Sequence, residues 1–79
     1  MTDNISMGIN EILILTNLTP GQKARHMRLS KRLRQVDLAS KAGVSVEEII
    51  WLEKDRYILP TRRKLIMTVL GLDDSNESD

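Results

Sequence analysis

Two short helix-forming segments in the middle of the chain are joined by a turn that leaves little freedom in how they can pack. The first segment, residues 34–43, ends in Gly43, the residue type that most readily adopts the left-handed conformation found just after a helix. The second starts at Ser45, and Glu48 three residues later completes the pattern of a capping box. Two short helices on either side of a Gly-containing turn predict a helix-turn-helix, in which the helices meet at a steep angle.

The apolar residues of this pair indicate which of its faces should pack inward. In the first helix, Ala39 suits the crossing point, because a small side chain lets two helices approach closely, and Val36 and Leu38 should be partly buried beside it. In and before the second helix, the residues expected to hold it on the core are Val44, Ile49 and Leu52.

One further helix is expected on each side of the pair. The earlier one has a capping residue at Thr19, followed by Pro20 and Gln22, and should run to about Arg32. The later one follows the loop that ends at Pro60; Thr61 is expected to cap it and Gly71 to end it. Since no segment has a convincing strand pattern, we predict an all-α fold, a compact bundle of four to five short helices with an N-terminal arm.

Composition divides the chain into three parts. Residues 19–72 hold the predicted helices and form the domain. Residues 1–18 form the arm, whose run INEILILTNL could be a short strand or one to two helical turns and is too apolar to remain exposed. We expect the arm to cover the core or to contribute to a dimer. Residues 73–79 are polar and acidic, and a disordered tail is expected there.

The net charge of +1 hides a strong segregation of charge along the chain. All twelve Lys and Arg residues lie between Lys23 and Lys64 together with five acids, a formal charge of +7, whereas the flanks hold acids only. A basic centre suggests a polyanionic partner, although a solvated helix surface between charged tails would give the same pattern.

Several functions are disfavoured by what the chain lacks. It has no Cys and one His, so we expect no metal site and no cofactor. The four glycines are isolated and form no phosphate-binding loop, and no Ser–His–Asp arrangement is suggested, so we do not expect an enzyme. The longest apolar run, residues 12–15, is far too short to cross a membrane and no signal peptide is recognisable, so a cytoplasmic protein is expected.

The run RQVDLASKAGVSVEEIIWLEKDRYILP resembles the phage repressor and Cro-type helix-turn-helix family. The matching positions are Gln35, Leu38, Ala39, Gly43, Val44 and Ser45, supported by Glu53 after the apolar pair and by Pro60 seven residues later. The resemblance extends over roughly residues 22–72. It implies a transcriptional regulator of a phage or mobile element, a repressor that binds double-stranded DNA as a homodimer on a palindromic operator.

The resemblance also implies roles for individual residues, with the helix after Gly43 entering the major groove. Its base-facing residues would be Ser45, Val46, Glu47, Ile50 and Trp51. The phosphate contacts would come from Gln35, Lys54 and Arg56, with help from Arg62 and Arg63. Arg28 and Glu53 would form a structural ion pair that fastens the first helix of the domain to the end of this one.

Some of these residues have simpler explanations. Glu47 could accept a hydrogen bond from a cytosine amino group or could merely favour the start of its helix. Val46 and Ile50 could touch thymine methyl groups or form a small exposed apolar patch. Trp51 could fold over Tyr57 and Pro60, or it could meet DNA or a second protein chain.

Two positions depart from the family pattern. Arg34 stands where a Ser or Thr cap is usual, so the capping bond of that helix should be lost. Asp55 replaces a common Gly, and Asp tolerates the left-handed conformation better than most residues.

The main alternative function is a protein-interaction module, an antitoxin or anti-repressor of the same family with a toxin or another regulator as its partner.

Overall fold

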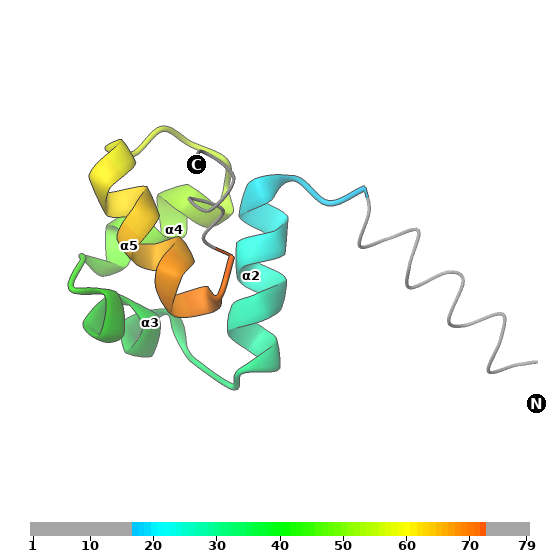
Figure 1. Cartoon of the computed structure of the whole chain (residues 1–79), viewed down its shortest axis with the longest axis horizontal. Coiled ribbons are helices and arrows are strands. Elements are labelled where there is room, and N and C mark those ends of the chain that lie inside the picture. Colours follow the sequence, from blue (N-terminus) through cyan, green and yellow to red (C-terminus); the bar gives the residue numbers. More distant parts are fainter. Residues whose placement is uncertain (1–16, 73–79) are drawn as a thin grey trace, which may run out of the picture.

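The computed structural model describes residues 17–72, so nearly all of the expected arm and the whole acidic tail lie outside the described residues. The described part contains four α-helices and no strand (Figure 1). In chain order they are α2 (Pro20–Ser30), α3 (Gln35–Ala42), α4 (Val46–Glu53) and α5 (Pro60–Leu70). This confirms the predicted all-α class. Within the same range, no helix combines the length and apolar character needed to cross a membrane.

The expected capping residues fix the starts of α2 and α4. Thr19 accepts a hydrogen bond from the backbone N–H of Gln22 at 3.1 Å, and its own N–H donates to the Gln22 side chain at 2.9 Å. Ser45 and Glu48 make the same reciprocal pair at 3.2 and 3.0 Å. Each box satisfies two backbone N–H groups at a helix start that would otherwise have no partner.

Glycine ends α3 and α5 as predicted, with left-handed φ angles of 73° at Gly43 and 76° at Gly71. Helix α2 instead ends at Ser30, slightly before the predicted Arg32. Arg32 follows the helix in the left-handed region, with φ of 59°. Residues other than Gly or Asn adopt this backbone conformation at some cost in free energy.

Two expectations about single residues are wrong. Thr61 does not cap α5, because the helix already includes Pro60 at its first position and has Leu59 as its N-cap, without a side-chain bond. The fixed φ of proline, and its lack of an N–H that would need a partner, allow the helix to begin there. Val36 is 48% exposed rather than partly buried, because α3 turns its other face, with Leu38 and Ala39, to the core.

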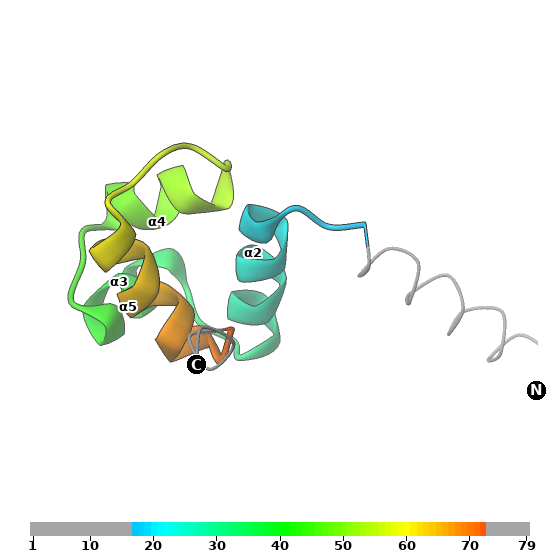
Figure 2. The same ribbon diagram turned by 45° about the horizontal axis from the view of Figure 1, so that its top comes forward.

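The core lies where the four helices meet, and the helix-turn-helix pair contributes half of it. The buried apolar residues are Ala24, Leu38, Ala39, Ala42, Ile49, Leu52, Ile58, Ile66, Met67 and Leu70. Ile49 and Leu52 are fully buried, and Val44 packs against the cluster from the turn, as expected. Helix α4 leaves the turn in a different direction from α3 and lies across the bundle (Figure 2).

The start of α2 meets the end of α4 in a close backbone contact. A Cβ atom on Gly21 would lie 2.4 Å from the carbonyl oxygen of Leu52, so only glycine fits there without a shift of the backbone. Asp55 lies in the left-handed region with φ of 60°, as its sequence position suggested. Its carboxylate accepts hydrogen bonds from the N–H of Gly21 at 2.8 Å and from the Thr19 hydroxyl at 2.5 Å. An acidic side chain is thereby bound at the positive end of the α2 dipole.

The start of α3 is held by an acid at its third position in place of a hydroxyl cap. Arg34, the N-cap residue, accepts no hydrogen bond with its side chain, as expected. Asp37 compensates in part, because its carboxylate accepts the backbone N–H of Arg34 at 2.9 Å and two guanidinium bonds at 3.0 Å. These bonds from Arg34, first through its side chain and then through its backbone, lower the pKa of Asp37 to about 2.

Replacing Gly21 with Ala should destabilise the domain. The added Cβ overlaps the backbone at the end of α4, and overpacking of this kind costs about 1–3 kcal/mol, more than the roughly 1 kcal/mol that Ala gains over Gly in a helix. Urea unfolding followed by circular dichroism measures the change. Arg25→Ala on the exposed side of α2 is the control and should change stability little. Equal stability of the Gly21→Ala variant and the wild type would contradict the close contact.

The Asp37 carboxylate should make stability depend on pH in the acid range. Its folded pKa of about 2 lies below the unfolded value of 3.8, so the charged form favours folding. That contribution is complete above the unfolded pKa and is lost as pH falls toward about 2. The difference in unfolding free energy between the wild type and Asp37→Asn should therefore shrink as pH is lowered from 5 to about 2. A difference that stays constant across this range would refute the assignment.

Candidate nucleic-acid interface

Helix α4 turns one face away from the core. Ile49 and Leu52 point into the core, and the side chain of Glu53 is only 5% exposed. The opposite face carries Glu47, Ile50, Trp51 and Lys54, which follow the i, i+3, i+4, i+7 spacing of one helix face. We name these four residues the α4 stripe. Because the capping box and two fully buried residues fix the helix, the stripe is held in one orientation on the domain.

The predicted base-facing residues do not all belong to this stripe. Ser45 is exposed, but its hydroxyl oxygen already accepts the capping hydrogen bond from the backbone N–H of Glu48. Its O–H is therefore the group that could still donate a hydrogen bond. Val46 is half-buried and packs against the core cluster, so less of it faces outward than expected. Ile50 is half-buried, and Glu47 is exposed without a partner among residues 17–72.

The exposed indole of Trp51 is the largest apolar feature of the stripe. Trp51 is 41% exposed, and Tyr57, over which it could have folded, is 79% exposed. Pro60 is also exposed. Because Tyr57 is so exposed, packing of Trp51 over Tyr57 and Pro60 is not favoured. The other two alternatives, contact of Trp51 with DNA or with another protein chain, remain.

A buried ion pair joins α4 to α2, as the family resemblance implied. The Arg28 Nε donates to Glu53 Oε2 at 2.6 Å and its Nη2 donates to Oε1 at 3.2 Å, with side-chain exposures of 8% and 5%. The third donor, Nη1, reaches the carbonyl of Leu33 at 2.9 Å. Gln35 joins the group by donating from Nε2 to Glu53 at 3.2 Å. One carboxylate and one guanidinium thus connect α2, the loop after it, the start of α3 and the end of α4.

This arrangement gives Gln35 a structural contact, which the family resemblance did not imply. The resemblance implied a phosphate contact for the same residue. Its amide nitrogen has a second hydrogen that the bond to Glu53 leaves available for an anion. The sequence position alone suggested only the phosphate role. The bond to Glu53 could not be read from the sequence, because the two residues are on different helices.

The five predicted phosphate-binding residues are not all gathered beside the α4 stripe. Lys54 ends α4 and is exposed on the stripe itself. Arg62 is 44% exposed and lies at the other end of α4, where its Nε is 3.7 Å from Glu48 and its Nη1 donates to the Gly43 carbonyl at 3.4 Å. These two cations therefore flank the helix at its end and at its start.

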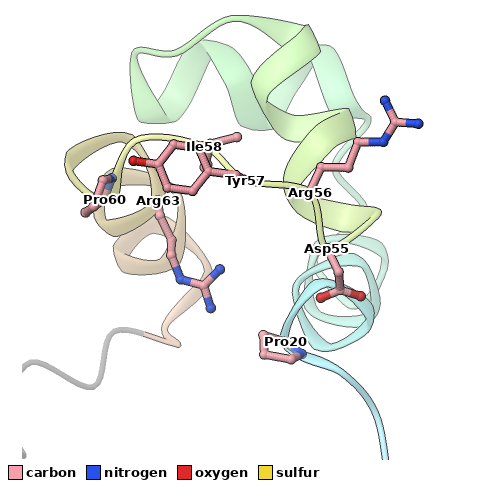
Figure 3. A pocket seen from close by; sticks show the side chains of 7 residues that line it. All are labelled: Pro20, Asp55, Arg56, Tyr57, Ile58, Pro60 and Arg63. Carbon is pink, nitrogen blue, oxygen red and sulfur yellow. The ribbon is translucent and has the colours of Figure 1, made fainter.

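Arg56 and Arg63 point in different directions. Both line a cavity of about 390 Å³, with Pro20, Asp55, Tyr57, Ile58 and Pro60 as the other lining residues. Figure 3 shows the guanidinium of Arg63 pointing into this cavity and that of Arg56 pointing away from it into solvent. Arg56 is thus exposed next to α4, while Arg63 faces the space between α5 and the start of α2.

The described surface has a large excess of unpaired positive charge. Three of the twelve cations are in ion pairs, Arg28, Arg34 and Arg62, which leaves nine without an acidic partner in residues 17–72. Of the five acids in the same range, Asp37, Glu48 and Glu53 are paired and Asp55 is bound at the α2 start. Glu47 is the one acid there without a partner. The described part of the chain therefore has nine cations without an acidic partner, against two acids, Glu47 and Asp55, that pair with no cation.

Comparisons of the chain with models of protein families, with curated proteins and with solved structures give no match. The resemblance to the phage repressor and Cro-type family accordingly stays a prediction, and it rests on the residues of the chain and on the geometry above.

Removing one member of the buried pair should strongly destabilise the domain. Glu53→Leu leaves the Arg28 guanidinium buried without a counter-charge, which costs about 3–5 kcal/mol. The double variant Arg28→Met, Glu53→Leu removes both charges and should be clearly more stable than Glu53→Leu alone. Chemical denaturation of the two variants measures this. If the single variant is as stable as the double, the pair does not hold α4 in place.

Proposed function

We propose that this protein binds double-stranded DNA with sequence preference and acts as a small transcriptional regulator. In this proposal it is a cytoplasmic repressor, and two copies bind a palindromic operator and block the promoter. The observation that carries the proposal is the α4 stripe, which is held on a helix-turn-helix, includes the unpaired cation Lys54 and lies beside the unpaired cation Arg56. A helix in this position is one that the family places in the major groove.

The unpaired cations and the other residues of this surface would have different roles in DNA binding. The unpaired cations neutralise phosphates and supply affinity that does not depend on sequence. In this proposal the stripe determines the preferred base sequence: Ile50 touches a thymine methyl group, and the Glu47 carboxylate accepts a hydrogen bond from the amino group of cytosine. In a homodimer the two α4 helices would enter grooves about one helical turn, roughly 34 Å, apart.

A second candidate function is favoured by the exposure of Trp51 and by the acid in the middle of a basic domain. A stripe of Glu47, Ile50 and Trp51 also suits a protein partner, such as a toxin or another regulator, because aromatic residues are enriched at protein interfaces. Such a partner would need Glu47, Ile50 and Trp51 but not Lys54 and Arg56. Substitution of those two cations therefore separates the candidates.

Selection of bound sequences from a pool of random duplexes should give an enriched motif with two-fold symmetry. For the selected duplex, affinity should fall as salt rises, because counterions return to the phosphates. Lys54→Gln and Arg56→Gln should each weaken binding and lower the slope of log affinity against log salt by about 0.9. Glu47→Gln should instead alter the preferred bases.

The matched control is Lys23→Gln, which removes the same charge from the side of α2 that faces away from α4. Its salt slope should stay close to that of the wild type. A pool without an enriched motif would refute sequence-specific binding. Equal effects of Lys23→Gln and Lys54→Gln would refute the placement of the surface on α4.

A further inference from the structure

An apolar cavity of about 210 Å³ opens on the side of α2 that faces away from α4. It is lined by Leu18, Lys23, His26, Met27 and Leu72, so the two ends of the described chain meet at its rim. Lys23, His26 and Met27 share one face of α2, whereas Gly21 and Arg28 face α4. The cavity is therefore separate from the surface assigned to DNA.

The volume and the lining suit aliphatic side chains. Leu18, Met27 and Leu72 are each half-buried, so they remain in partial contact with water. An enclosed apolar cavity of about 150 Å³ can hold a benzene molecule, so this one has room for one or two aliphatic side chains. Covering it would remove further apolar surface from water at about 25 cal/mol per Å².

The segment of the chain just before Leu18 has the matching composition. Five of the seven residues at positions 9–15 are Ile or Leu, and the one charged residue among them is Glu11. The rim of the cavity carries Lys23 and His26, so an acidic residue on an apolar segment is complementary to it.

Chain geometry brings this segment within reach of the cavity. Leu15 precedes the wall residue Leu18 by three positions, which span at most about 10 Å when extended. Met27 lies seven positions after the first residue of α2, about 10 Å along the helix axis. A reversal at Thr16 and Asn17 would lay the segment back along α2, and Asn is a favoured turn residue.

We propose that residues 9–15 fold back on their own chain and fill the cavity beside α2. A second copy could offer the same segment, but a short tether gives the chain's own segment an effective concentration near the millimolar range, well above that of a free partner. The segment then completes the core of its own domain. The dimer must form through another surface, and the α4 stripe is left uncovered.

Cross-linking tests this directly, because the natural chain has no Cys and two introduced thiols are the only ones present. Asn10→Cys is combined with Lys23→Cys on the cavity rim, or with Ser40→Cys on the exposed side of α3 as the control. A short bismaleimide is added to each full-length variant, and denaturing gel electrophoresis separates internal from intermolecular links. The first pair should link internally several-fold faster than the control pair.

A third variant separates docking from tethered proximity. It keeps the first Cys pair and adds Ile12→Asn, Leu13→Asn and Ile14→Asn, with circular dichroism as the check that the domain is folded. Internal linking should fall to the rate of the control pair. Linking that persists would show simple proximity, dimeric products would show that a second copy supplies the segment, and equal rates for the first two pairs would show no docking. Each of these results overturns the proposal, and none depends on whether the protein binds DNA.

Discussion

The position of α4 depends on the buried pair between Arg28 and Glu53. The carboxylate accepts two bonds from the guanidinium and one from Gln35, while Arg28 also binds the carbonyl of Leu33. A buried ion pair contributes little net stability over well-packed apolar residues, but it is costly to break. Its value in this domain is geometric, because it joins the end of α4 to three other segments and leaves the α4 stripe with one orientation.

A second contact supports the same helix end from outside the core. Asp55 binds the start of α2 through Gly21 and Thr19, and the glycine permits an approach that no larger residue would allow. The two contacts together place the basic segment that follows α4. They explain how a small domain with a limited core can hold the proposed DNA-binding surface in one place.

Much of this architecture could be predicted from local sequence, and the errors have local causes too. The capping boxes at Thr19 and Ser45 and the left-handed Gly43 involve neighbours along the chain, so their patterns were readable. The N-cap of α5 is Leu59 rather than the expected Thr61, because Pro60 can begin a helix. The residue pattern alone did not decide between these two starts. The contacts of Asp55 with Gly21, of Gln35 with Glu53 and of Arg62 with Glu48 join different segments of the fold. No spacing rule reveals such contacts without the fold.

The distribution of charge connects this geometry with the proposed function. Four of the five acids in residues 17–72 are engaged in contacts that hold the fold, whereas nine of the twelve cations are not. Two of the three acids on α4, Glu48 and Glu53, thus have structural roles. Glu48 caps the helix and pairs with Arg62, and Glu47 is the one α4 acid left for the proposed contact with a base.

The most direct measurement uses Trp51, the single Trp of the chain, which stands in the middle of the α4 stripe. Its fluorescence should change in intensity and wavelength as duplex DNA is added, and the change should saturate at the same DNA concentration as an independent measure of binding such as anisotropy of a labelled duplex. Binding by anisotropy that leaves the Trp51 emission unaltered would contradict the account, because DNA would then lie on a surface other than α4.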